Sequence, residues 1–164
     1  MAYLLDANVF IQAKNLHYGF DFCPAFWDWL DAAHASGKVF SIEKVGDELR
    51  GMEDELSTWA AKRGEPFFVR PDARVFPALA TVSAWASGGR YEPAAVSTFL
   101  QAADYYLVAM ALSGQHSVVT HEVPSNSVRK IKIPDACIGL GVKFVTPYAM
   151  LRMERARFTL GRTP

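Results

Sequence analysis

Cysteine is scarce in this sequence, which has only Cys23 and Cys137 among its 164 residues. The two are far apart, form no CxxC spacing, and lie in apolar stretches of helical spacing, a setting typical of buried thiols. The histidines show neither HxH nor HExxH spacing. These absences argue against a zinc site made of cysteine and histidine.

An excess of charge is also missing, because 17 basic and 17 acidic residues cancel. Nucleic-acid binding would therefore depend on local patches rather than on net charge. No apolar stretch reaches the roughly 20 residues of a membrane-spanning helix, and the N-terminus has no basic region followed by a cleavage site. We expect a cytoplasmic, soluble protein without membrane contact.

Hydrophobic residues make up 51% of the chain, which is ample for the core of one domain. We expect a single domain over residues 1–164, with about 150–164 forming the end of a C-terminal helix and a tail. Apolar runs predict strands at 3–5, 39–41, 117–120 and 142–145, and residues 66–71 are expected to form a short strand or an extended crossing. Periodic segments predict helices at 22–37, 42–52 with Ser41 as N-cap, 53–63, 75–85, a long one around Asp104, 134–140, and one opened by Pro147. This alternation predicts an α/β fold, with a mostly parallel sheet covered by helices on both faces.

Asp6 is the most informative residue, because it ends the apolar run Tyr3-Leu4-Leu5 and is the only charged residue among the first thirteen. Parallel α/β sheets bind ligands at the carboxyl ends of their strands. An acid at this position is therefore a candidate functional residue. The structural alternative is an acid that caps the following helix.

Asp104 is similarly isolated, as the only Asp, Glu, Lys or Arg between Pro93 and His121. An unpaired carboxylate in an apolar setting normally gains a proton, a partner or a metal ion. A bound cation is one explanation for its presence.

Two further acids complete a candidate cluster. Glu48 lies beside the apolar stripe of the 42–52 helix, about 60° from Val45 at 100° per residue, although it could instead pair with Lys44 on the surface. Glu122 follows the strand that ends at Thr120. Clustered carboxylates suit hard cations such as Mg²⁺ or Mn²⁺, and a metal ion of this kind can orient water for phosphodiester hydrolysis. The number of ions stays open.

The segments 3–11 and 118–122, together with Glu48 and Asp104, resemble PIN domains, and the likeness covers nearly the whole chain. Residues 26–30 and 133–137 resemble an uncharacterised prokaryotic group of PIN-like proteins, whose broader kin include VapC-type toxins. The resemblance implies a three-layer α/β/α sandwich with a five-stranded sheet, Mg²⁺- or Mn²⁺-dependent endoribonuclease activity, a protein antitoxin as partner, and a homodimer. The matched site residues are the acids Asp6, Glu48 and Asp104, and the polar residues Asn8 and Thr120.

The fourth acid departs from the PIN pattern, which usually has Asp two residues after the threonine, where this chain has Glu122. Its side chain is one methylene longer and can still reach a metal. Asp135, at the start of a short helix, competes as the fourth acid or as an outer-shell ligand. Both assignments remain open from the sequence, with Glu122 favoured.

Candidate basic residues for the RNA backbone are Lys14 and the cluster Arg129, Lys130 and Lys132, although the alternative of a solvated charge run is slightly favoured. Two rival functions are retained: a PIN-like protein- or RNA-binding module without catalysis, and a DNA nuclease or phosphatase that uses the same acids. The sequence thus leads to a metal-dependent ribonuclease as the main hypothesis, and to a toxin role only through the resemblance.

Overall fold

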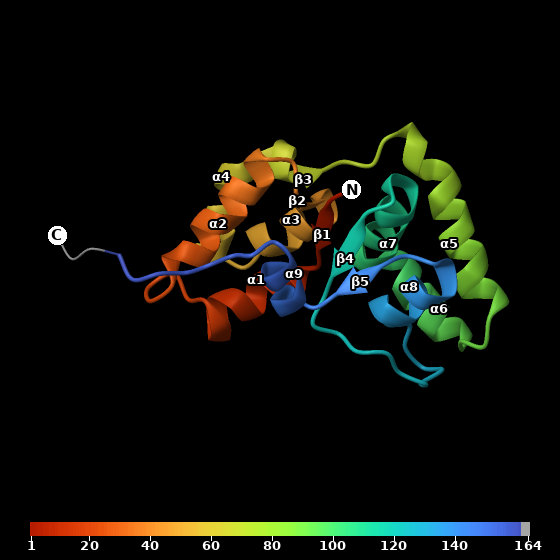
Figure 1. The fold of residues 1–164 in the computed structure, drawn as a ribbon. Coiled ribbons are helices and arrows are strands. Elements are labelled where there is room, and N and C mark those ends of the chain that lie inside the picture. The colour runs from red at the N-terminus through yellow and green to blue at the C-terminus, as the bar shows by residue number, and fades with distance from the viewer. Residues whose placement is uncertain (162–164) are drawn as a thin grey trace.

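The computed structural model describes residues 1–161 and shows a five-stranded sheet between two groups of helices (Figure 1). All strand pairings are parallel, in the order β3-β2-β1-β4-β5. This arrangement confirms the predicted α/β class with a parallel sheet covered on both faces. The strands are β1 (Tyr3–Leu5), β2 (Val39–Ile42), β3 (Phe68–Val69), β4 (Ser117–Val119) and β5 (Phe144–Val145).

The helices surround this sheet as the predicted alternation requires, because each parallel crossover carries at least one helix. They are α1 (Ala7–Gln12), α2 (Pro24–Ala35), α3 (Glu43–Arg50), α4 (Glu55–Phe67), α5 (Phe76–Gly88), α6 (Pro93–Gln101), α7 (Ala103–Gly114), α8 (Ile133–Leu140) and α9 (Pro147–Met153). A π-helical segment, Ala13–His17, continues α1, and a 3₁₀ turn, Ala73–Val75, precedes α5.

The central strand β1 explains why the first apolar run is continuous rather than alternating. Leu4 pairs with Phe40 on one side and with Val118 on the other, and Leu4 and Leu5 are completely buried. A strand with neighbours on both edges and helices on both faces has no side that meets water. The chain therefore first reaches a polar residue at Asp6, where β1 ends.

The start of α3 differs from the prediction that Ser41 caps it. Ser41 is completely buried within β2, and its hydroxyl donates a hydrogen bond of 2.6 Å to the Leu5 carbonyl. Ile42 holds the N-cap position instead. A buried hydroxyl needs a partner, and here the neighbouring strand provides it, so Ser41 joins β2 to β1.

The predicted long helix around Asp104 is wrong, because the chain forms two helices, α6 and α7, that meet at an angle of 73°. Ala102 separates them with an extended backbone, at ψ 160°. Asp104 consequently lies in the first turn of α7. Within residues 1–161, no single helix is long and apolar enough to span a membrane; α6 and α7 reach that length only together, across this bend.

Helices α1 and α9 are the first and the last helix within residues 1–161. Helix α1 directly follows β1, in a stretch whose helical bounds were not predicted, and it buries Val9 and Phe10 in the core. The predicted C-terminal helix is α9, which begins at Pro147 and ends at Met153. Beyond it, Phe158 packs edge-on against Tyr18, with 5.7 Å between ring centroids. Residues 162–164 of the predicted tail lie outside the described part.

Candidate functional site

Asp6 holds the centre of the candidate site, at the carboxyl end of the central strand. Its backbone N–H donates to the Val119 carbonyl at 3.0 Å, and its carboxylate accepts a hydrogen bond of 3.1 Å from the Thr120 hydroxyl. Asp6 occupies the N-cap position of α1 but makes no side-chain capping bond there. The Asp6 side chain therefore points toward the end of β4. The alternative that Asp6 acts as a helix cap is not supported by a capping bond.

The environment of Asp6 disfavours its charge. The residue is 4% exposed, and burial, followed by the charges of Asp104 and Glu122, raises its pKa from 3.8 to about 7. The Thr120 hydroxyl opposes this shift because it stabilises the ionised form. The structure thus brings Asp104 and Glu122 close enough to Asp6 for their charges to interact.

Asp104 approaches from the first turn of α7. Burial, and next the charge of Glu122, raises its pKa from 3.8 to about 6, with a smaller contribution from Glu48. The Lys130 ammonium acts in the opposite direction. Asp104 therefore belongs to the same electrostatic group as the two glutamates, and Lys130 lies near it.

Thr120 links two of the acids through one buried hydroxyl. It donates to the Asp6 carboxylate and accepts the backbone N–H of Glu122 at 3.1 Å. The Glu122 side chain in turn accepts the backbone N–H of Ile133 at 2.9 Å, at the start of α8. Glu122 is thus held at the strand end, with one carboxylate oxygen committed to the protein backbone.

The other two residues of the predicted set lie further out. Glu48 is exposed on α3, and Asn8 is exposed on α1, two residues after Asp6. Lys44 does not pair with Glu48 but places its ammonium 4.5 Å from the centroid of the Tyr106 ring. The surface ion pair considered for Glu48 is therefore not formed.

Asp135 has a local structural role. Both of its carboxylate oxygens accept the backbone N–H of Ser125, at 3.1 and 3.2 Å. This contact fixes the loop between β4 and α8 to the first turn of α8. It favours Glu122, whose charge acts on both Asp6 and Asp104, over Asp135 as the fourth acid of the group.

The donor chemistry of this group fits a hard divalent cation. All the donors are carboxylate oxygens, and no salt bridge within residues 1–161 neutralises any of Asp6, Glu48, Asp104 and Glu122. In the same part of the chain, no three His, Cys, Asp or Glu side chains converge into a ready-made ion site. Mg²⁺ is commonly held by one or two carboxylates together with waters and substrate phosphates, so an open arrangement of this kind suits it.

The predicted basic residues separate into two groups. Lys14 makes a salt bridge of 2.9 Å with Asp54, and Lys132 is half-buried at the N-cap of α8. Arg129 and Lys130 are exposed and line a hollow of about 230 Å³ together with Asp104. Of the predicted basic residues, these two therefore share a hollow with one of the acids.

A cluster of polar rings beside the acids was not predicted. The Tyr148 hydroxyl and the His17 Nε2 are 2.9 Å apart, and the His17 and His121 ring centroids are 5.5 Å apart. Burial lowers the pKa of His121. The three residues come from the segment after α1, the end of β4 and helix α9. The only signal in the sequence was the position of His121 next to Glu122.

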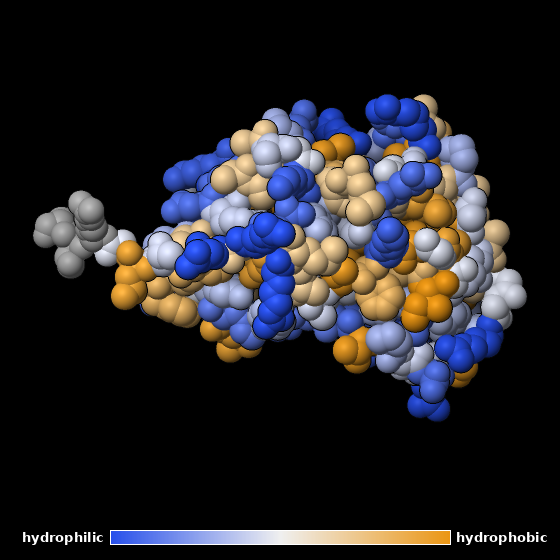
Figure 2. All heavy atoms as spheres, in the orientation of Figure 1, coloured by the Kyte–Doolittle hydropathy of each residue, from blue (hydrophilic) through white to orange (hydrophobic). Residues whose placement is uncertain are grey.

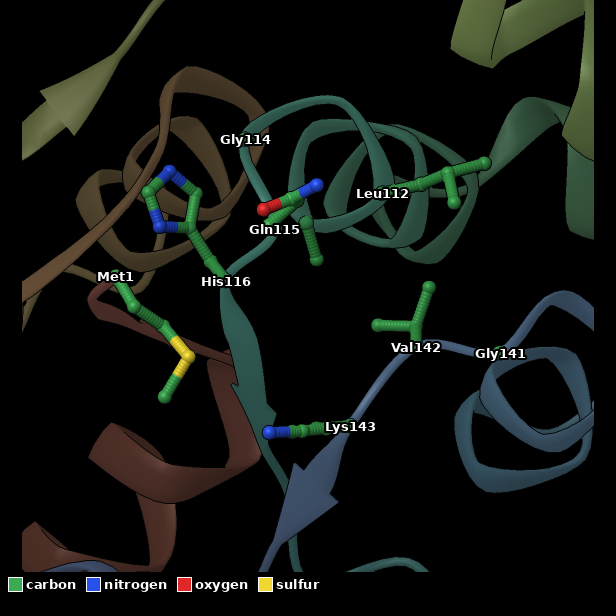
Figure 3. Close-up of a pocket in the computed structure, with 9 residues that line it drawn as sticks. Met1, Leu112, Gly114, Gln115, His116, Gly141, Val142 and Lys143 are labelled. Carbon is green, nitrogen blue, oxygen red and sulfur yellow. The ribbon is translucent and has the colours of Figure 1, made fainter.

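A separate hollow of about 450 Å³ lies at the opposite, amino edge of the sheet (Figure 3). His116, Gln115 and Lys143 contribute its polar side chains, and His116 accepts the Ala2 N–H at 3.0 Å. The length of the strands separates this hollow from Asp6 and Thr120. On the face drawn in Figure 2, both hydrophilic and hydrophobic side chains are exposed.

The comparisons with known proteins give one family. No curated protein and no solved structure matches the chain. The sequence model of DUF4411, a domain of unknown function, matches residues 3–158, a range that includes all the acids described above. The chain therefore belongs to the DUF4411 family.

Proposed function

We propose that this protein is a metal-dependent nuclease that hydrolyses RNA phosphodiester bonds at the carboxyl edge of its sheet. One observation carries the proposal. Asp6 and Asp104 are carboxyl groups in largely buried positions, their pKa values are raised by burial and by neighbouring acids, and they have no cationic partner in a salt bridge within residues 1–161. Perturbed groups of this kind cluster at functional sites.

Asp6, Asp104, Glu122 and Glu48 are the residues that would hold a Mg²⁺ or Mn²⁺ ion. When bound, such an ion supplies Lewis-acid chemistry: it orients a water molecule and neutralises charge on the phosphate. The positive charge of the ion would also offset the mutual repulsion of the acids. Because their pKa values are raised, Asp6 and Asp104 hold protons at a higher pH than usual, and these protons would be released when the metal ion binds.

The remaining residues position these acids and the substrate. Thr120 fixes the orientation of Asp6 through its hydroxyl, and the Ile133 N–H fixes Glu122. Arg129 and Lys130, at the hollow beside Asp104, are placed to contact the phosphates of a bound strand. An acidic residue that would hold a cation, Asp104, therefore lies beside two basic residues that would contact phosphates, Arg129 and Lys130.

The choice of RNA, and a toxin role with a protein antitoxin, rest on the resemblance to PIN domains. Carboxylates and a divalent cation serve DNA cleavage or phosphatase chemistry equally well. A panel of single-stranded RNA, single-stranded DNA and a phosphomonoester separates these activities. Cleavage of RNA alone supports the proposal, and equal cleavage of DNA contradicts its substrate assignment.

The decisive experiment compares the wild type with Asp104→Asn on a mixed-sequence RNA, with and without Mn²⁺. We expect fragments that require both the metal and Asp104. Asp28→Asn, which changes an exposed acid on α2, is the matched control and retains cleavage. No cleavage by folded wild type in Mn²⁺ contradicts the proposal.

A non-catalytic RNA- or protein-binding module is the second candidate. The bond between Glu122 and the Ile133 N–H favours it, because this bond takes one carboxylate oxygen away from a metal ion. An RNA mobility-shift assay distinguishes the two. A module binds RNA equally well as wild type or Asp104→Asn and produces no fragments from it.

A further inference from the structure

The hollow beside Asp104 has a defined shape built by segments far apart in the sequence. Helix α6 contributes Ala95, Thr98 and Phe99, the bend contributes Ala102, and the segment 129–131 closes the other side. The loop that leaves β4 returns to α8 past α6 (Figure 1), and the Glu92 N–H donates to the Val128 carbonyl at 2.9 Å. This backbone bond holds the two walls together.

The lining of the hollow is apolar inside and cationic at its rim. Ala95, Phe99 and Ile131 are 3 to 4% exposed and form its apolar part. The Arg129 side chain is 85% exposed, and its salt bridge to Glu92 is long, at 4.0 Å. Lys130 takes part in no salt bridge within residues 1–161. Both cations are therefore available to a ligand.

This division matches the chemistry of a nucleotide, which has a flat base with apolar faces and an anionic phosphate. The volume of about 230 Å³ lies below the roughly 300 to 1,000 Å³ of sites for drug-sized molecules. A duplex does not fit into a space of this size, whereas a single unstacked base does. Proteins that read single-stranded RNA accept bases in this way, on apolar or aromatic side chains.

We propose that this hollow binds one nucleotide of single-stranded RNA, with its base in the apolar part beside Phe99 and Ile131 and its phosphate at Arg129 and Lys130. Because Asp104 also lines the hollow, this nucleotide would be a neighbour of the bond cut by the acids. The inference rests on the proposed function for its role in cleavage. Binding of the nucleotide itself requires only the hollow and its cations.

The test measures binding without cleavage. Uridine and adenosine 5′-monophosphate are titrated in EDTA into the full chain and followed by NMR shifts, with ribose 5-phosphate and inorganic phosphate as probes without a base. We expect at least one nucleotide to bind roughly fivefold or more tightly than ribose 5-phosphate, the smallest gain expected from one stacked base. Equal binding of all four probes overturns the proposal.

Variants locate the ligand. Thr98→Trp fills the hollow and should abolish nucleotide binding, whereas Ser97→Trp places the same side chain on the adjacent, exposed position of α6 and should leave it unchanged. Lys130→Ala changes an exposed residue, does not threaten folding, and should weaken binding several-fold. If nucleotide binding is unchanged in both Thr98→Trp and Lys130→Ala, the ligand binds elsewhere and the proposal is overturned. Tighter binding of an acidic peptide than of a nucleotide at the hollow also overturns it.

Failure of this proposal and failure of the proposed function are distinguishable. Nucleotide binding without metal-dependent cleavage would support the nucleotide site and contradict the nuclease activity. Cleavage of RNA without nucleotide binding in the hollow would support the nuclease activity and contradict the nucleotide site. In a nuclease with a functional hollow, Thr98→Trp also changes which bases flank the cut sites, and Ser97→Trp does not.

Discussion

At the scale of single residues, the buried carboxyl of Asp6 couples stability to pH. An unfolded aspartate ionises near 3.8, whereas the folded pKa of Asp6 is about 7. The folded state thus favours the protonated form, and the corresponding stability is fully present below about pH 4 and is lost as the pH rises through 7. In the metal-free protein Asp6 is therefore about half protonated near pH 7 and becomes a buried charge as the pH rises further.

We expect Asp6→Asn, which keeps the shape and removes the charge, to gain stability relative to the wild type as the pH rises from about 5 to 8 in EDTA, by on the order of a few kcal/mol. Denaturant unfolding at several pH values measures this difference. Burial lowers the pKa of His116 and His121, which gives the opposite pH dependence, but both proteins contain them and their effect cancels. A difference that does not vary with pH contradicts the raised pKa.

Thr120 is the second residue with a specific energetic role. Its buried hydroxyl bonds both the Asp6 carboxylate and the Glu122 N–H. We expect Thr120→Val, which has the same shape but no hydroxyl, to lose about 1–3 kcal/mol of unfolding free energy, because both partners lose a hydrogen bond. Thr120→Ser keeps the hydroxyl and should lose less. Equal stability of the two variants in chemical denaturation would show that the bridge has no energetic effect.

At the scale of elements, the packing of α3 on β3 depends on a glycine. A Cβ at Gly46 would lie 2.8 Å from Cγ of Phe68 and 3.0 Å from Nη1 of Arg50. Helix propensity alone predicts that Gly46→Ala stabilises α3 by up to about 1 kcal/mol. The crowding instead leads us to expect a loss of about 1–3 kcal/mol.

The control for this prediction lies at the end of the same helix. At Gly51 an added Cβ meets its nearest atoms at 3.5 and 3.6 Å, an ordinary contact. We expect Gly51→Ala to change stability by less than about 0.5 kcal/mol. Thermal unfolding of both variants measures the contrast, and a stabilised Gly46→Ala would show that α3 can move away from Phe68 without cost.

At the scale of the whole molecule, metal and substrate should stabilise the fold together. A ligand that binds only the folded state adds about 2.7 kcal/mol at a hundred times its dissociation constant. Because Mg²⁺-type sites often include substrate phosphates, we expect Mn²⁺ to raise the melting temperature further when a non-cleavable RNA analogue is present. Calorimetry with each ligand alone and with both measures this coupling.

Variants of the acids test which residues produce this effect. Asp6→Asn and Glu122→Gln should remove most of the stabilisation by Mn²⁺. Asp135→Asn should lower the baseline stability, because the bonds to the Ser125 N–H are weakened, but keep the response to the metal. If Asp135→Asn removed the stabilisation by Mn²⁺ and Glu122→Gln kept it, the fourth acid would be Asp135.

Several features followed from local sequence alone. The uninterrupted apolar run at Tyr3-Leu4-Leu5 predicted a strand, and the structure buries this strand at the centre of the sheet. Pro147 marked the start of α9 because its fixed φ suits the first position of a helix. The isolation of Asp6 and Asp104 among apolar residues indicated buried acids, and both have raised pKa values. Each of these features depends on a few consecutive residues.

Only the tertiary structure decided which distant residues meet. Thr120 and Asp6 are 114 positions apart, and their bond exists because parallel strands β1 and β4 end at the same edge. The bend at Ala102 and the pairing of Lys14 with Asp54 have no signal in the neighbouring residues. The sequence thus determined which residues are buried or charged, through local hydrophobicity. Packing between segments far apart determined which acids and cations face one another, because those contacts form only when the whole sheet assembles.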